Sequence, residues 1–318
     1  MVKVVFLDAD SLDRQDLDFS TLQVEGVQLQ LYPSTTAEQI LPRLADAQVA
    51  IVNKVVLSAE ILQALPKLQL ILVSATGTNN VDLVQAKAQG IDVRNCQGYG
   101  TAAVAQHTLM LMLALATNFV RYQQAVQAGQ WQQSSQFCLL DYPISELSGK
   151  KLAIVGYGEL GQAVAALARA FAMEVLVCVR PGAEAKAGRI ELDEALRQAD
   201  FVSLHCPLTE QTRDLFDAKR LAKMKPSAFL INTARGGIVN EQALLEALQR
   251  GQLAGAATDV LSIEPPRQGN PLLGQSLPNL LITPHCAWGS RESRQRMLGQ
   301  LRENLVAWQQ GQSLRRLV

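Results

Sequence analysis

Three side chains of complementary chemistry, Arg235, Glu264 and His285, each stand shortly after an apolar run. An arginine can bind a carboxylate through two N–H groups while it polarises the neighbouring oxygen. An imidazole can exchange the proton of a hydroxyl group, and a carboxylate beside it orients the ring and favours its protonated form. Together they suit the oxidation of an alcohol beside a carboxylate. Taken singly, they have plainer interpretations as a solvated arginine, a turn-forming glutamate and a structural histidine.

The glycine pattern "GYGELG" at 156–161 is a second chemical signal. It follows an apolar run and precedes the helical run "AVAALARAFA". The glycines permit a tight turn, and the helix N terminus offers N–H groups to a phosphate. This pattern predicts a dinucleotide-binding loop.

The residue type expected after the second strand of such a unit is missing. An acidic residue about 20 positions after the glycines usually binds the adenosine ribose. Val179 and Arg180 occupy that place, and Glu174 falls at the opposite end of the strand. An absent negative charge and a present positive charge favour NADP over NAD. The alternative is that Arg180 contacts adenine or solvent and that both cofactors are used.

Strand-like runs alternate with helical runs along most of the chain, which is typical of parallel α/β sheets. The first series of predicted strands comprises 2–7, 49–52, 69–73 and 91–93. The second series comprises 151–156, 175–179, 201–205, 228–233, 255–260 and 279–283. Helices are expected between these strands, and also at 101–117 and at about 290–310.

The two series predict two domains. Residues 1–98 and 290–318 form a discontinuous substrate-binding domain, and residues 99–289 form a dinucleotide-binding domain inserted into it. Ligands of open parallel sheets bind outside the carboxyl ends of the strands. In the second series those ends carry Gly156, Gly158, Gly161, Val179, Arg180, His205, Cys206, Pro207, Thr233, Ala234, Arg235, Asp259 and His285.

Composition narrows the class of protein. The chain has 318 residues, 48% of them hydrophobic, with 29 basic and 29 acidic residues. This balance argues against nucleic acid or a membrane surface as the partner. Five cysteines without a CxxC pair suggest reduced thiols, and no metal site is predicted. We expect a cytoplasmic protein, because no signal peptide opens the chain and the apolar run 101–117 is slightly too short to span a membrane.

Several motifs resemble, in order and spacing, the D-2-hydroxyacid dehydrogenases. They are "GYGELG", "HCPLTEQT", "INTARGGIVNEQALLEAL", "ATDVLSIEPP" and "ITPHCAW", and "SATGTNNVDL" and "GYGTAAVAQHT" extend the likeness over essentially the whole chain. "NKVVLSAE" and the tryptophan after "PHCA" most resemble the glycerate dehydrogenase and hydroxypyruvate reductase branch. The resemblance implies a Rossmann-type domain with a parallel sheet of six or more strands, a smaller flavodoxin-like α/β domain, a hinge, and a homodimer formed through the nucleotide domain.

The resemblance also implies roles for particular residues. Arg235 binds the substrate carboxylate and carbonyl, His285 is the acid–base group, and Glu264 holds the histidine. Asp259 binds the nicotinamide amide. The implied cofactor-binding set is Thr76, Gly156, Gly158, Glu159, Leu160, Gly161, Val179, Arg180, His205, Cys206, Pro207, Thr212, Thr233, Ala234, Arg235, Asp259, His285 and Ala287. The implied substrate-binding set is Lys54, Thr76, Gly77, Arg235, His285 and Trp288.

The expected function is reduction of a small 2-oxoacid, hydroxypyruvate or glyoxylate, to D-glycerate or glycolate. The hydride would come from the reduced form of NADP, or from that of NAD if both cofactors are used. One alternative is a dehydrogenase of a bulkier 2-oxoacid. The other is a nucleotide-sensing protein like the transcriptional corepressors of the same fold, against which the neutral charge and the lack of appended binding tails argue.

Overall fold

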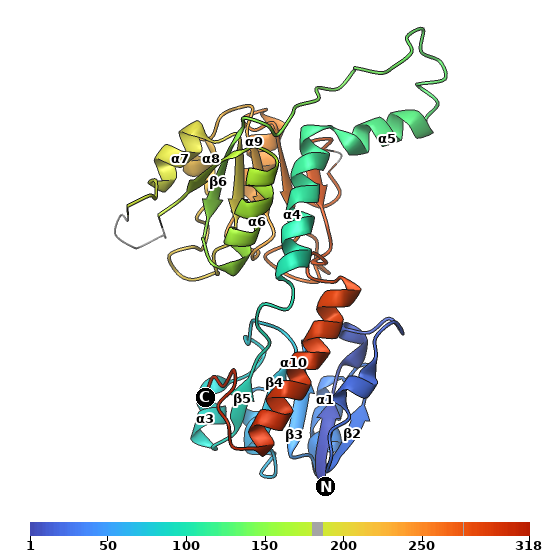
Figure 1. Ribbon diagram of the computed structural model, residues 1–318, viewed down its shortest axis with the longest axis vertical. Coiled ribbons are helices and arrows are strands. Elements are labelled where there is room, and N and C mark those ends of the chain that lie inside the picture. The colour runs from blue at the N-terminus through green and yellow to red at the C-terminus, as the bar shows by residue number, and fades with distance from the viewer. Residues whose placement is uncertain (180–186, 276) are drawn as a thin grey trace. The chain divides into compact units, whose positions relative to one another are not determined.

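The structure is a computed structural model that describes residues 1–179, 187–275 and 277–318 (Figure 1). The chain divides into two compact units. Unit one comprises Met1–Gly100 and Trp288–Val318, and unit two comprises Thr101–Ala287. These limits lie two residues from the predicted domain limits at each crossing. Substrate binding by unit one and dinucleotide binding by unit two stay predictions.

Unit one is built on a five-stranded parallel sheet in the order β2-β1-β3-β4-β5, which is the flavodoxin-like order. Its strands are β1 (Val2–Phe6), β2 (Val27–Leu31), β3 (Val49–Val52), β4 (Leu70–Val73) and β5 (Asp92–Arg94). Two short 3₁₀ turns, η1 (Ala9–Ser11) and η2 (Phe19–Leu22), lie between β1 and β2.

Alternate residues of these strands face opposite sides of the sheet, as the period of two requires. In β1, Val5 packs with residues of α1 (Ala37–Leu44), α2 (Ala59–Gln63) and α3 (Leu83–Ala88). Val4 and Phe6 instead pack with Met297, Leu298 and Leu301 of α10 (Arg291–Gln309). The last long helix of the chain therefore covers one face of the first sheet.

The sequence prediction contains no strand at β2, and this omission is wrong. The segment reads "VQLQL", and its glutamines are exposed while Val27 and Leu29 are half-buried. An edge strand has only one neighbour and does not need the continuous apolar run of a central parallel strand. Its weak hydrophobic signal follows from that position.

Unit two is built on a six-stranded parallel sheet in the order β11-β10-β9-β8-β6-β7. Its strands are β6 (Lys151–Val155), β7 (Glu174–Val177), β8 (Phe201–Leu204), β9 (Phe229–Asn232), β10 (Gly255–Thr258) and β11 (Leu280–Ile282). Beyond β7, an isolated parallel bridge joins Cys178 to Ile190. The two parallel sheets confirm the predicted α/β fold class.

Helices cover both faces of this sheet. Leu152 and Ile154 pack with α4 (Thr101–Ala116) and α6 (Glu159–Ala170), which lie side by side in Figure 1. Ala153 and Val155 pack on the other face, with residues of α7 (Leu192–Gln198), α8 (Ala218–Leu221) and α9 (Glu241–Gln249). The four central strands are thus mostly buried on both sides, and the carboxyl ends of the strands form the open end of the sheet.

No single helix in the described ranges is long and apolar enough to cross a membrane. Helix α4 and the following α5 (Phe119–Gln127) pass that test of length and composition only as a pair, and the pair is bent by 63°. The bend falls at Asn118, which has a left-handed φ of 50°. The inward side of α4, including Thr108, Leu111 and Met112, is buried in the core of unit two.

Candidate active site

The glycine loop after β6 is shaped by two close backbone approaches. A Cβ on Gly156, whose φ is +99°, would lie 2.6 Å from the backbone of His205 and Cys206. A Cβ on Gly161 would lie 2.1 Å from the carbonyl oxygen of Gly156. Only glycine fits these two positions. The loop must therefore pass directly beneath the end of β8.

Helix α6 begins within the same loop. Gly158 is its N-cap, and apart from its two chain neighbours none of the described residues has an atom within 4 Å of a Cβ placed there. Glu159 and Leu160 begin the helix, so their backbone N–H groups lie in the first turn, where helices leave donors for an anion. The Glu159 carboxylate accepts a hydrogen bond from the Thr101 hydroxyl at 2.6 Å.

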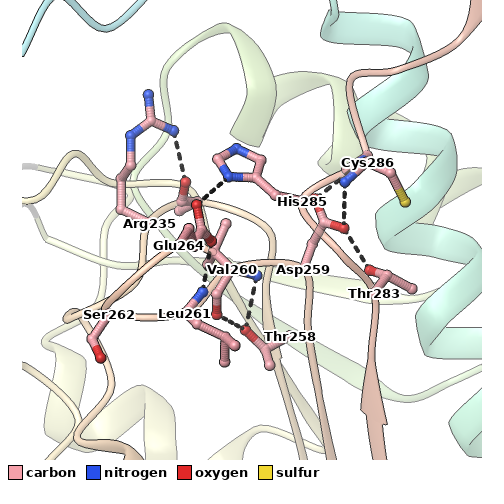
Figure 2. A network of polar contacts seen from close by, with 12 residues as sticks. Arg235, Thr258, Asp259, Val260, Leu261, Ser262, Glu264, Thr283, His285 and Cys286 are labelled. Carbon is pink, nitrogen blue, oxygen red and sulfur yellow. Dashed lines mark hydrogen bonds and ion pairs between the residues drawn. The ribbon is translucent and has the colours of Figure 1, made fainter. Parts of the chain in front are cut away.

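The predicted acid–base pair is in contact. His285 Nδ1 lies 2.5 Å from Glu264 Oε2, and Glu264 Oε1 accepts the backbone N–H of Leu261 at 2.7 Å (Figure 2). Both side chains are about one-third exposed. Because Nδ1 faces the carboxylate, Nε2 is turned to the opposite side of the ring. A carboxylate on one ring nitrogen fixes the orientation of the imidazole.

The backbone at His285 has a left-handed φ of 53°, which is uncommon for a residue other than glycine. Asp259 supplies the hydrogen-bond acceptors for the backbone N–H groups of this turn. Its carbonyl accepts the His285 N–H at 2.8 Å, and its carboxylate accepts the N–H groups of Cys286 at 3.0 Å and Ala287 at 2.9 Å. Asp259 is 2% exposed. Its side chain therefore builds the histidine loop from the end of β10.

Arg235 lies on a tight turn after β9. The side chain of Asn232 accepts the N–H of Ala234 and donates to the carbonyl of Arg235, both at 3.0 Å. The Arg235 guanidinium is on an exposed residue and donates to the Ala234 carbonyl at 2.8 Å. A Cβ on Gly236 would lie 1.9 Å from the Leu261 carbonyl oxygen. The arginine turn is therefore in direct backbone contact with the loop that leads to Glu264.

The residues after β8 form a compact turn. Burial lowers the pKa of His205 to about 4, and its Nε2 lies 2.8 Å from the Ser203 hydroxyl. Within the described ranges no hydrogen-bond partner reaches its buried Nδ1. Burial also raises the pKa of the Cys206 thiol to about 11, so this cysteine is not an activated nucleophile. The Thr212 hydroxyl donates to the Pro207 carbonyl at 2.7 Å and closes the turn.

Val179 and Arg180 were predicted to follow the second strand of the nucleotide domain, and the structure describes only the first of them. Val179 is 7% exposed, and its N–H donates to the Ile190 carbonyl at 2.9 Å. Arg180 lies outside the described residues. Glu174 is the first residue of β7 and pairs with Lys151, the first residue of β6, at 3.7 Å. It therefore lies at the edge of the sheet opposite the glycine loop, as predicted.

The predicted substrate residues of unit one lie in loops after its strands. Lys54 follows β3, and its N–H donates to the Asp8 carboxylate at 2.7 Å. Thr76 and Gly77 follow β4, and the Thr76 hydroxyl donates to the Cys96 carbonyl at 3.0 Å. Trp288 meets the ring of Tyr99 edge-on at 6.3 Å between centroids.

The sequence predicted no role for His107. In the structure its side chain joins the hydrogen bonds around Asp259. His107 Nε2 lies 3.0 Å from the Thr283 hydroxyl, which in turn donates to Asp259 Oδ1 at 2.5 Å. Ligand atoms of His107, Asp259 and Cys286 lie within 4.8 Å of one another, a spacing that can hold a metal ion. The Asp259 carboxylate, however, already accepts hydrogen bonds from Thr283, Cys286 and Ala287. We therefore interpret this group as a hydrogen-bonded support of the histidine loop.

Fold and site together are those of a dinucleotide-binding oxidoreductase. A glycine loop and a helix N terminus lie at the carboxyl end of one strand of a parallel sheet, and the loops after two other strands carry an imidazole–carboxylate pair. The family model described as "D-isomer specific 2-hydroxyacid dehydrogenase, NAD binding domain" matches residues 109–287. The chain belongs to the D-isomer specific 2-hydroxyacid dehydrogenase family. Unit two thus contains the NAD-binding domain of the family.

Relatives support this membership over the full length. The chain is 46% identical to a glycerate dehydrogenase of Methylorubrum extorquens over 311 residues, which cover 97% of this chain and 96% of that protein. It is 38% identical to a hydroxypyruvate reductase of Blautia hydrogenotrophica over 317 residues, 98% of each. Among solved structures, the TT0316 protein from Thermus thermophilus superposes with a TM-score of 0.87 at 34% identity over 100% of both chains.

Proposed function

We propose that this 2-hydroxyacid dehydrogenase interconverts a small 2-oxoacid, hydroxypyruvate or glyoxylate, with D-glycerate or glycolate. The observation that carries the reaction type is the contact of Glu264 with His285 next to the turn that bears Arg235. The names of the two relatives, glycerate dehydrogenase and hydroxypyruvate reductase, support the substrate class.

In the proposed reaction the guanidinium of Arg235 binds the substrate carboxylate and stabilises the negative charge that develops on the carbonyl oxygen. His285 transfers a proton between its Nε2 and that oxygen, while Glu264 holds the ring through Nδ1. The proposed substrate residues of unit one are Lys54, Thr76, Gly77 and Trp288. A nicotinamide dinucleotide supplies or accepts the hydride when it is bound.

The residues present fit such a cofactor. Open space at Gly158 and the first-turn N–H groups of Glu159 and Leu160 suit a pyrophosphate. Asp259 Oδ2 accepts the Ala287 N–H, and a carboxylate oxygen can accept a second donor such as the nicotinamide amide. The remaining proposed cofactor residues are Thr76, Gly156, Gly161, His205, Cys206, Pro207, Thr212, Thr233, Ala234, Arg235, His285 and Ala287.

We propose that NADP is preferred over NAD. Val179 places no carboxylate at the end of β7, and Glu174 is at the opposite end of that strand. A 2′-phosphate would therefore meet no negative side chain from either residue, and Arg180 supplies a positive charge next in sequence.

We also propose that the protein forms a homodimer through unit two. Residues 119–144 carry a series of exposed large apolar side chains, among them Phe119, Trp131, Phe137, Leu140 and Ile144. Such a concentration on one segment is typical of a surface that another chain covers. Light scattering should give twice the chain mass of 34.6 kDa. Replacing Phe137 and Leu140 with Asp should yield a monomer, and a wild-type monomer would contradict the proposal.

The proposed reaction is tested by initial rates with hydroxypyruvate and glyoxylate, each with NADPH and with NADH. Fast turnover with NADPH is expected for both substrates. Turnover with NADH alone would support the proposed reaction and contradict the proposed preference for NADP. Absence of turnover with either substrate would contradict the proposed substrate class. Larger 2-oxoacids in the same assay then distinguish a bulkier substrate from a protein that only senses the nucleotide.

A further inference from the structure

We propose that Glu241 is a positioning residue for the Glu264–His285 pair. Its carboxylate fixes loop 260–264, the segment that leaves β10 and carries Glu264. The inference rests on the proposed function, because it assigns Glu241 an effect on the proton transfer made by His285.

Three hydrogen bonds connect Glu241 to this region. Glu241 Oε1 accepts the backbone N–H of Ser262 at 2.7 Å. Glu241 Oε2 accepts the Ser262 hydroxyl at 2.7 Å and the side-chain amide of Asn270 at 2.8 Å. Hydrogen bonds to an ionised acceptor are shorter and stronger than those between neutral groups. One half-buried carboxylate thus connects Ser262 with Asn270, and both of these residues belong to the segment that follows β10.

Ser262 is two residues before Glu264, which brings this attachment close to the reacting pair. Glu264 itself folds back, so that its Oε1 accepts the Leu261 N–H while its Oε2 contacts His285. The backbone of 261–262 also lies against Gly236, next to Arg235. A shift of Ser262 therefore moves the carboxylate that orients the histidine.

Glu241 is not needed to cap its own helix. It is the first residue of α9, but the N-cap is Asn240, whose side chain accepts the Ala243 N–H at 3.0 Å. The hydrogen bonds of the Glu241 carboxylate described above all go to residues outside the helix. By contrast, Glu246 of the same helix pairs with Gln242 and Arg250, both on or next to α9. Glu246 therefore provides a matched control of the same residue type on the same helix.

The first experiment is a double-mutant cycle with the purified full-length enzyme. Glu241→Ala should lower kcat about tenfold, since small displacements of a catalytic group are costly. KM for the cofactor and the thermal midpoint should stay close to those of Glu246→Ala. In a Glu264→Ala background, Glu241→Ala should lower kcat less than about twofold, because the group it positions is already gone. Equal losses in both backgrounds, or no loss in either, would overturn the proposal.

The second measurement does not depend on turnover. The backbone N–H of Leu261 donates a hydrogen bond to Glu264 and not to Glu241. Its hydrogen exchange therefore reports how well ordered loop 260–264 is. We expect faster exchange of this amide in Glu241→Ala and wild-type exchange in Glu246→Ala. If the wild-type enzyme reduces no 2-oxoacid, the proposed function fails and this exchange alone decides the positioning role. Wild-type exchange in Glu241→Ala would then contradict it.

Discussion

Asp259 holds His285 in its left-handed backbone conformation. The carbonyl of Asp259 accepts the His285 N–H, and its carboxylate accepts the next two backbone N–H groups along the chain. A left-handed residue other than glycine costs roughly 1–2 kcal/mol. The hydrogen bonds that the buried Asp259 carboxylate accepts offset that cost, so the proposed acid–base group is presented by a strained turn that a neighbouring strand supports.

Replacing Asp259 with Asn should therefore destabilise the enzyme and lower its activity. The new NH₂ group would face donors, either the Ala287 N–H or those of Thr283 and Cys286, and an unsatisfied buried donor costs about 1–3 kcal/mol. Urea unfolding measures the stability, and initial rates measure the activity. Glu191→Gln, an exposed position in the same unit, is the control. An unchanged unfolding midpoint in Asp259→Asn would show that the turn does not depend on the carboxylate.

Replacing His285 with Ala should lower kcat by about 10²-fold or more, the size of effect that loss of a general acid produces. Cofactor affinity should change little, because His285 is one of many proposed cofactor contacts, and the glycine loop and the N terminus of α6 stay intact. Cofactor fluorescence titration and initial rates measure the two quantities on one preparation. A variant that retains the wild-type rate would remove His285 from the proton transfer.

The open sheet edge was predictable because strand ends follow directly from local apolar runs. The glycine pattern, Arg235, Glu264 and His285 each follow such a run, so the rule that ligands bind at strand ends located them. The supporting contacts were not predictable. Glu241 and Ser262 are 21 positions apart, and neither belongs to a pattern of spacing that signals a hydrogen bond. Such contacts depend on how two loops meet in three dimensions, and a single sequence carries no direct signal of that.

Replacing Val179 with Asp should shift cofactor preference toward NADH. A carboxylate at the end of β7 accepts the ribose hydroxyls of NADH and repels the 2′-phosphate of NADPH. We expect the ratio of kcat/KM for NADPH over NADH to fall by about tenfold or more, corresponding to roughly 1.4 kcal/mol. Val179→Asn is the matched control, since it adds polarity without charge. If both variants keep the wild-type ratio, the residue after β7 does not determine the preference between NADPH and NADH.

The pH dependence of stability should contain a contribution from His205. Burial holds its folded-state pKa at about 4, below the ordinary value of 6.5. As the pH falls below about 6.5, the unfolded chain binds a proton that the folded chain excludes, so the free energy of unfolding decreases until the folded ring also titrates near pH 4. The stabilisation is therefore present above about pH 6.5 and lost toward about pH 4, with an upper limit of about 3 kcal/mol.

His205→Gln should remove this contribution, because the amide can bond to Ser203 and does not titrate. Urea unfolding of both proteins, measured from about pH 7 to about pH 4, should give curves that converge as the pH falls, with the wild type losing more stability. The protonated ring would also carry an N–H on both nitrogens, and within the described ranges no hydrogen-bond partner reaches the buried Nδ1. Parallel pH curves for the two proteins would show that the folded-state pKa of the His205 ring lies close to its ordinary value.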